Sequence, residues 1–268
     1  MTNAQFKMLR CETAGAQAVA AATRHVFPRH WHEQYGVGVI HQGAHRSHSG
    51  RGMVEAGAGD VITVNPGEVH DGAPIGDAGR SWRMLFFEPA LIAAAIWDMS
   101  EGDSNSYEFS RPVITDAGLA RVFQCLFSAM TMTGDAAYGM RREELLLELL
   151  AGIVRPLDRA ASQAPAAIRR ARTLIDEEPA APVALADLAR ECGLSRFQVL
   201  RGFVKATGFT PHAYLMQRRT DLARRLIARK TRLADAAAIS GFADQSHMTR
   251  LFVRKYGVSP GAYAAVFT

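Results

Sequence analysis

Two stretches of this chain carry the same pattern. Arg201–Tyr214 reads RGFVKATGFTPHAY, and Arg250–Tyr263 reads RLFVRKYGVSPGAY, at a constant offset of 49 positions. An arginine, a Phe-Val pair, a glycine, a Thr-Pro or Ser-Pro step and a final Ala-Tyr keep the same spacing in both. Unrelated segments rarely keep register, so the equal offset indicates a duplicated structural unit.

Each copy belongs to a predicted helix, tight turn and helix. In the first, Gly193 suits the positive φ that ends a helix, and Ser195 suits the N-cap of the next helix, which runs to Lys205. In the second, the helix Leu233–Ile239 and the turn Ser240-Gly241-Phe242 precede a helix capped by Asp244. Both copies are therefore predicted to be helix-turn-helix units.

The second helix of each unit has an inward and an outward face. Val199 and Phe203 are expected to point inward in the first copy, and Met248 and Phe252 in the second. The outward residues are Arg196, Phe197, Leu200 and Arg201 in the first copy, and Gln245, Ser246, Thr249 and Arg250 in the second. In a helix-turn-helix protein this outward face enters the major groove of DNA.

One such unit alone is weak evidence, because packed helical corners are common. Two units with the same cap, turn and arginine favour DNA binding. The helix predicted over 211–228 separates them, and major grooves on one face of a duplex repeat every ~34 Å. Its arginines are candidates for phosphate contacts, or for an ordinary solvated face: Arg218, Arg219, Arg224, Arg225 and Arg229.

The charge distribution supports a polyanionic partner for the second half. Residues 166–268 hold 17 Lys and Arg against 8 Asp and Glu, a net charge of about +9, whereas residues 1–165 carry about −4. The length of 268 residues suits two domains, which we predict at 1–160 and 166–268, with a linker at Ala160–Ala166.

The first half is predicted to be β-rich and then helical. Val37–Ile40, Val61–Val64 and Trp82–Phe87 are strand-like runs separated by glycine-rich turns, which indicates an antiparallel sandwich or barrel. Helices are expected after the N-cap Asp116 and over 138–154. Their apolar stripes fit either a dimer contact or burial within the same domain.

Composition excludes several classes of protein. The three cysteines are odd in number and have no CxxC spacing, so no disulfide framework or cysteine metal site is expected. The longest apolar run, Ala90–Trp97, is far too short to span a membrane, and no signal peptide is recognised. We expect a cytoplasmic protein without a membrane partner.

Residues 167–268 resemble the AraC/XylS family of bacterial transcription regulators. The resemblance rests on Ala186-Asp-Leu-Ala189 with Gly193-Leu-Ser195, Leu200-Arg-x-Phe203, Gly208-Phe-Thr-Pro211, Arg218-Arg219 with Ala223 and Leu226, Ile239-x-Gly241-Phe242, Phe252 and Gly257-Val-Ser-Pro260-x-x-Tyr263. It implies two units that read promoter DNA, usually to activate transcription, with the eight outward residues as base-contact candidates. Leu200 departs from the family, in which a polar residue is frequent there, so a contact with a base methyl group is expected of it.

The first half resembles a cupin sensor domain. The resemblance rests on His30-x-His32 and on Gly59-Asp60-(x)4-Asn65-Pro66-Gly67-Glu68-Val69-His70. It implies a pocket for a small-molecule effector, with the candidates His30, His32, Tyr35, His70 and Trp82. Three histidines suit a metal, but Gly36 and Val37 stand where the cupin glutamate is expected, so we predict no metal and no cofactor.

The fold class predicted is therefore a two-domain α+β protein, with a cupin-like β-barrel plus helices followed by an all-α domain with two helix-turn-helix units. The function predicted is a DNA-binding transcription regulator, an activator and not an enzyme, controlled by a small-molecule effector. RNA polymerase and a second copy of the chain are further candidate partners. Two alternatives are a cupin metalloenzyme fused to a DNA-binding module, and a non-specific architectural DNA binder.

Overall fold

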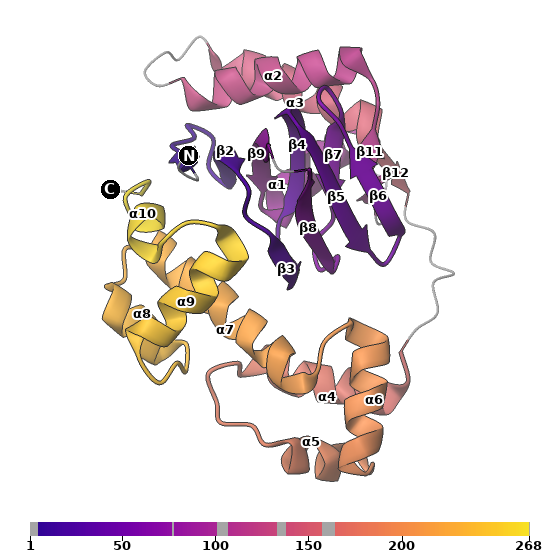
Figure 1. Ribbon diagram of the computed structural model, residues 1–268, viewed down its shortest axis with the longest axis vertical. Helices are drawn as coiled ribbons and strands as arrows, with labels where there is room; N and C mark the ends of the chain where they lie inside the picture. Colours follow the sequence, from indigo (N-terminus) through magenta and orange to yellow (C-terminus); the bar gives the residue numbers. More distant parts are fainter. Residues whose placement is uncertain (1–4, 77, 101–106, 133–137, 157–163, 268) are drawn as a thin grey trace. The chain divides into compact units, whose positions relative to one another are not determined.

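The structure is a computed structural model that describes residues 5–76, 78–100, 107–132, 138–156 and 164–267. The chain divides into two compact units, Met1–Asp158 and Arg159–Thr268. The first is rich in strands and the second is helical (Figure 1). The predicted linker lies largely outside the described residues.

The first unit contains two larger antiparallel sheets. One has the strand order β1-β2-β9-β4-β7-β11, and the other has the order β3-β8-β5-β6. The bounds of the first sheet are β1 Gln5–Leu9, β2 Ala16–Thr23, β9 Arg80–Phe87, β4 Tyr35–Gln42, β7 Val61–Val64 and β11 Val113–Ile114. Those of the second are β3 Phe27–His30, β8 His70–Ile75, β5 Ala44–Ser49 and β6 Gly52–Ala56.

Strand alternation gives the six-stranded sheet two apolar faces. Trp82 and Met84 of β9 pack with Ile40 of β4 and Ala56 of β6, in a cluster that draws on both sheets. Leu85 and Phe87, one residue out of phase, pack into a larger cluster with the helices on the other face. The first of these two clusters, here the inner cluster, is where an effector pocket is to be sought.

Three helices cover the outer face of this sheet (Figure 1): α1 Pro89–Met99, α2 Ala117–Thr131 and α3 Tyr138–Ile153. The apolar stripes of α2 and α3 are buried in the larger cluster, so burial within the domain is confirmed over a dimer contact for these stripes. Asp116 caps α2 as predicted, because its Oδ1 accepts from the amides of Gly118 and Leu119. A short sheet of β10 (Tyr107–Phe109) and β12 (Val154–Pro156) completes the unit.

The second unit contains seven described helices, and the helices predicted over 211–228 and Leu233–Ile239 have these bounds in the structure. The seven helices are α4 Ala166–Glu177, α5 Leu185–Cys192, α6 Arg196–Thr207, α7 Pro211–Ala228, α8 Leu233–Ile239, α9 Gln245–Tyr256 and α10 Pro260–Ala264. The central helix α7 packs against α4 and α6 and also against α8, α9 and α10. It therefore joins the two helix-turn-helix units.

Candidate functional sites

The first helix-turn-helix unit is formed by α5 and α6. Gly193 ends α5 with φ 64°, a left-handed backbone conformation that glycine adopts without strain because it has no Cβ. Ser195 and Gln198 form a capping box at the start of α6: the Gln198 amide donates to Ser195 Oγ at 3.2 Å, and the Ser195 amide donates to Gln198 Oε1 at 2.8 Å. Val199 and Phe203 are fully buried. The predicted turn, cap and inward face are confirmed.

The outward face of α6 is basic and aromatic. Arg196, Phe197 and Arg201 are exposed, and the Phe197 side chain is 63% exposed. The Arg201 guanidinium carbon lies 5.5 Å from the centroid of the Phe197 ring. The cation and the ring therefore form one surface, which suits stacking on a base or contact with a thymine methyl group.

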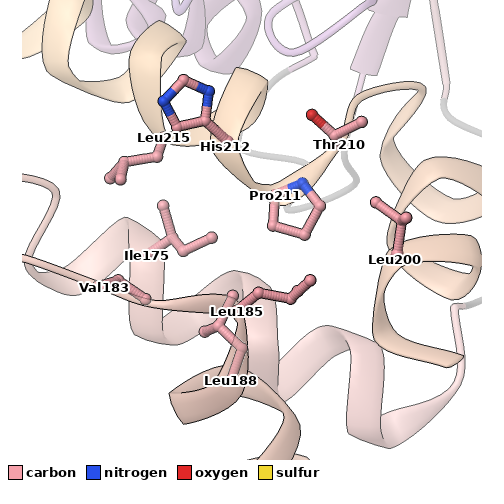
Figure 2. Close-up of a pocket in the computed structure, with 9 residues that line it drawn as sticks. All are labelled: Ile175, Val183, Leu185, Leu188, Leu200, Thr210, Pro211, His212 and Leu215. Atoms are coloured by element: carbon pink, nitrogen blue, oxygen red, sulfur yellow. The ribbon is translucent and has the colours of Figure 1, made fainter. Parts of the chain in front are cut away.

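Leu200 lies elsewhere than predicted. It is partly buried and lines an apolar pocket of about 220 Å³ between α4, α5, α6 and α7 (Figure 2). The other lining residues are Ile175, Val183, Leu185, Leu188, Thr210, Pro211, His212 and Leu215. The partly buried Leu200 side chain therefore faces this apolar pocket, whereas its predicted place was on the outward face with the exposed Arg196, Phe197 and Arg201.

The second unit repeats the arrangement with α8 and α9. Asp244 Oδ1 accepts from the His247 amide at 2.7 Å, so the predicted cap is confirmed. Met248 and Phe252 are fully buried, as predicted. Gln245, Ser246 and Arg250 are exposed, and Thr249 is partly exposed. The structure thus brings the second set of candidate residues together on one face.

The arginines of α7 mostly hold the domain together. Arg218 pairs with Asp176 of α4 at 2.9 Å. Arg219 donates to the carbonyl oxygens of Pro179 at 2.8 Å and Ala181 at 3.0 Å, and also to that of Gly241. Arg224 is 3% exposed. A phosphate cannot reach a buried guanidinium, so the phosphate contact predicted for Arg224 is wrong, and Arg218 and Arg219 are already paired within the protein.

A buried polar network fixes α9 on α7. Lys255 and Asp221 are 3% and 1% exposed, and the ammonium group of Lys255 pairs with Asp221 Oδ1. The Tyr256 hydroxyl donates to the same oxygen at 2.6 Å, and burial together with this carboxylate raises the pKa of Tyr256 well above its usual value. This network has no signature in the sequence, because a lysine at the end of a basic helix has no pattern that marks it as buried.

The three predicted histidines meet between the sheets. His30 lies in β3, His70 in β8 and His32 in the loop after β3, with one ring nitrogen of each within 4.8 Å of the others. His30 Nδ1 lies 2.8 Å from the Pro28 carbonyl oxygen, and His70 Nδ1 lies 2.9 Å from that of Glu68. A carbonyl oxygen only accepts, so both Nδ1 atoms carry the proton and each Nε2 offers a lone pair when the ring is neutral.

This histidine cluster (His30, His32, His70) has metal-ligand donors but lacks the acidic ligand of the cupin motif. The described part of the chain adds no carboxylate to the group. His30 Nε2 and His32 Nε2 lie 3.2 Å apart and form a hydrogen bond with each other. The same atoms are placed to bond polar groups of a small molecule.

Trp82 lies on the same side as the histidine cluster, and Tyr35 does not. Phe27 is in ring contact with both Trp82 and His30. The Tyr35 hydroxyl instead donates to the Tyr107 carbonyl oxygen at 3.2 Å, and the Tyr35 ring packs with Phe109 against the larger cluster on the helix side of the sheet. Odd-numbered residues of β4 face the helices, so Tyr35 is separated by the sheet from the other four candidates.

Arg80 is a charged residue of this region that was not among the predicted site residues. It begins β9, two residues before the inward Trp82, and is 3% exposed. The signal available was a charged residue in phase with the inner face of a strand. His45 of β5 also faces this interior, and burial, Arg80 and His70 lower its pKa to about 3.

In the part of the chain that the structure describes, no helix combines the length and apolar character that a membrane span requires.

Two family models match the chain. The AraC-like ligand binding domain covers residues 17–150, half of the chain, and a helix-turn-helix domain covers residues 188–265. The first contains the two larger sheets apart from β1 and most of the covering helices. The second contains both helix-turn-helix units apart from the first turns of α5.

Relatives and solved structures agree with these matches. The chain is 29% identical to the HTH-type transcriptional regulator YbfI of Bacillus subtilis over 227 residues, and this aligned region covers 83% of this chain and 81% of that protein. It is 40% identical over 84 residues to the transcriptional activator NphR of a Rhodococcus species, covering 31% of this chain and 25% of that one.

The fold of the whole chain is similar to that of ToxT from Vibrio cholerae. An apo variant of ToxT gives a TM-score of 0.61 at 14% identity, covering 97% of this chain and 100% of that chain. A structure of wild-type ToxT bound to an unsaturated fatty acid gives 0.58 at 12% identity, covering 100% and 98%. The predicted two-domain α+β fold is confirmed, and the chain belongs to the AraC-type family of DNA-binding transcription regulators that carry an effector-binding domain.

Proposed function

We propose that this protein activates transcription from promoters that α6 and α9 read together. The base-contact residues proposed are Arg196, Phe197, Arg201, Gln245, Ser246, Thr249 and Arg250. Leu200 is left out because its side chain lines the apolar pocket. The observation that carries the proposal is the repetition: each helix begins at a side-chain cap, buries a phenylalanine and exposes an arginine six residues after that cap.

The effector site proposed is the region of the inner cluster around His30, His32, His70 and Trp82. It combines an apolar and aromatic wall with converging imidazole nitrogens, which is the usual make-up of a small-molecule pocket. Tyr35 is left out, because the sheet separates it from these side chains. The domain then acts as a sensor and carries out no reaction.

Control by the effector requires a difference in affinity. An effector shifts the protein toward a DNA-binding conformation only if it binds that conformation more tightly than the other. Activation further requires that the bound protein helps RNA polymerase at the promoter, and a second copy of the chain is a candidate partner for adjacent sites. Because a bacterial transcription regulator acts on chromosomal DNA, the localisation that belongs to this proposal is the cytoplasm.

The test begins with selection of duplexes from a random pool by the full-length protein. Transcription by a bacterial RNA polymerase from a template with the selected site is then measured with and without the protein. We expect transcription to increase with wild type and to remain basal with the double variant Arg201→Ala, Arg250→Ala. If the selection enriches no duplex sequence, the proposal is contradicted. If the protein lowers transcription from the selected site, the protein is a repressor and not an activator.

The histidine cluster is the one observation that favours a metalloenzyme instead. Three imidazoles are a common ligand set for zinc, iron or manganese. An enzyme would need a bound metal and turnover of a substrate. Metal analysis of the purified protein separates the two functions, since the sensor proposed here requires no metal.

A further inference from the structure

Arg80 is a buried cation in the interior of the sensor domain. The alternate residues Trp82 and Met84 of the same strand belong to the inner cluster, and Arg80 is 3% exposed. Burial lowers the pKa of its guanidinium to about 10, so the group remains protonated at neutral pH. A full positive charge therefore lies between the sheets.

Its hydrogen bonding is incomplete. Nη1 donates to the His25 carbonyl oxygen at 3.3 Å, and the guanidinium carbon lies 4.8 Å from the centroid of the Trp82 ring. Nε and Nη2 are buried and have no hydrogen-bond partner among the described residues, which also provide no carboxylate within ion-pair distance of Arg80. Buried charges in proteins are normally paired, because desolvation of an isolated ion is costly.

The unused donors have a specific geometry. Nε–H and Nη2–H form the side edge of the guanidinium, which matches the two oxygens of a carboxylate in a pair of parallel hydrogen bonds. The side chains beside this edge carry no compensating negative charge. His45 is neutral at physiological pH, and its Nδ1 also lacks a hydrogen-bond partner in the described chain.

Gly72 of β8 leaves the edge of Arg80 without a covering side chain. A Cβ placed on Gly72 would lie 3.7 Å from Arg80 Nη2 and 2.8 Å from His45 Cε1. The His45 side chain, which is partly exposed, thus lies next to the guanidinium. Nε and Nη2 are enclosed in this conformation, so an incoming group has to displace the His45 ring.

We propose that the effector is a small monocarboxylate, whose two oxygens accept hydrogen bonds from Nε and Nη2 of Arg80 while its apolar body lies against Trp82 and Phe27. This inference rests on the proposed function, because it assigns a chemical class to the effector of the sensor domain. A single negative charge is inferred because Arg80 is the one buried cation in contact with the inner cluster among the described residues. A dianionic phosphate would leave one buried charge uncompensated.

The test uses full-length protein and a panel of pairs that differ only in charge: aliphatic carboxylates of graded length, benzoate and phenylacetate, each with its neutral amide, together with phenylphosphonate. Binding is followed by the change in unfolding temperature and by calorimetry. The variants are Arg80→Met, which removes the buried charge, and Arg83→Gln, which removes an exposed charge three residues along the same strand.

At least one carboxylate should stabilise wild type and Arg83→Gln, and its amide should not. Arg80→Met should weaken that carboxylate roughly 100-fold, the effect expected from loss of two charge-assisted hydrogen bonds. Without ligand, Arg80→Met should unfold at the same temperature as wild type or higher, since the variant loses one long hydrogen bond to the His25 carbonyl oxygen and the contact with Trp82 but no longer buries an uncompensated charge. A purely structural Arg80 would instead give a variant of lower unfolding temperature, which would overturn the inference.

Other outcomes also overturn it: binding of no carboxylate in the panel, equal binding of acid and amide, tighter binding of the phosphonate, or equal carboxylate binding by Arg80→Met. The effect of each bound compound on DNA affinity separates this inference from the proposed function. A neutral compound that alters DNA binding would contradict the inference that the effector is a carboxylate and would leave the sensor role intact. A carboxylate bound at Arg80 without any effect on DNA binding would contradict the sensor role alone.

Discussion

Arg250 and Arg254 provide a matched pair for testing base recognition by α9. Both are exposed arginines on the same helix, one turn apart. Arg250 belongs to the outward face with Gln245 and Ser246, whereas Arg254 is in the last turn. Replacement of either by alanine removes one positive charge from the same helix, so the two variants lose similar long-range attraction to DNA.

The two variants should differ in sequence discrimination. An arginine bonded to two base acceptors contributes about 1–3 kcal/mol of discrimination, which corresponds to roughly 5- to 150-fold in affinity for the selected site. Arg250→Ala should lose this factor on the selected duplex and relax preference at one base position. Arg254→Ala should weaken selected and scrambled duplexes alike, and a lost phosphate contact should reduce the salt slope by about 0.9.

The assay is fluorescence anisotropy with the selected and a scrambled duplex, over a salt series from about 50 to 200 mM. The ratio of the two dissociation constants is the decisive quantity, because a misfolded variant loses both affinities. An unchanged ratio for Arg250→Ala, with equal loss on every sequence, would refute base reading and support a non-specific architectural binder.

Three further predictions concern the interior of each unit. Burial and Arg80 lower the pKa of His45 to about 3. As the pH falls, His45 therefore takes up a proton in the unfolded state before it does so in the folded state. The stability that neutral His45 contributes above pH 6.5 is thus lost progressively toward pH 3. Between pH 7.5 and 5, the free energy of unfolding of wild type should fall by about 2 kcal/mol more than that of His45→Asn. Urea unfolding followed by tryptophan fluorescence measures this for the first unit, because all three tryptophans lie there. Equal losses in the two proteins would contradict the buried neutral histidine. Lys255→Met removes the cation that pairs with the buried carboxylate of Asp221 and leaves it the hydrogen bond from Tyr256, so it should destabilise the second unit by about 3–5 kcal/mol, with much of this recovered by adding Asp221→Leu. Hydrogen exchange of the α7 and α9 amides measures this, and a single variant as protected as wild type would show that the pair stabilises little. Finally, plasma mass spectrometry should find no stoichiometric zinc, iron or manganese, because the proposed sensor uses the imidazole nitrogens of the histidine cluster for hydrogen bonds; one metal per chain would favour the enzyme alternative.

The helical half could be predicted closely because its signals are local. Ser195, Thr210, Asp244 and Ser259 each accept a hydrogen bond from a backbone amide at the start of a helix, and glycines with positive φ end two of these helices. Caps and glycine turns act over three or four residues, so the sequence alone contains them. The helix α1 was not predicted, since an apolar run of its length has no periodicity that separates helix from buried strand.

The sensor pocket could be predicted only in part, because it depends on register between distant strands. The resemblance to the cupin motifs grouped His30, His32 and His70, and the structure brings them together although His32 lies in the loop after β3. Tyr35 was predicted in the same pocket but lies on the other face of the sheet, because a shift of one residue along β4 moves a side chain to the opposite face. Arg80 could not be singled out, because the absence of a partner for its Nε and Nη2 is a property of the folded interior.

The central claim is that α6 and α9 of one chain read neighbouring turns of a duplex. Hydroxyl-radical footprinting of the full-length protein on its selected site measures this most directly. We expect two protected blocks on one face of the DNA, with centres about 10–10.5 base pairs apart, and loss of one block with Arg201→Ala and of the other with Arg250→Ala. A single block, or two blocks that both variants weaken equally, would contradict it.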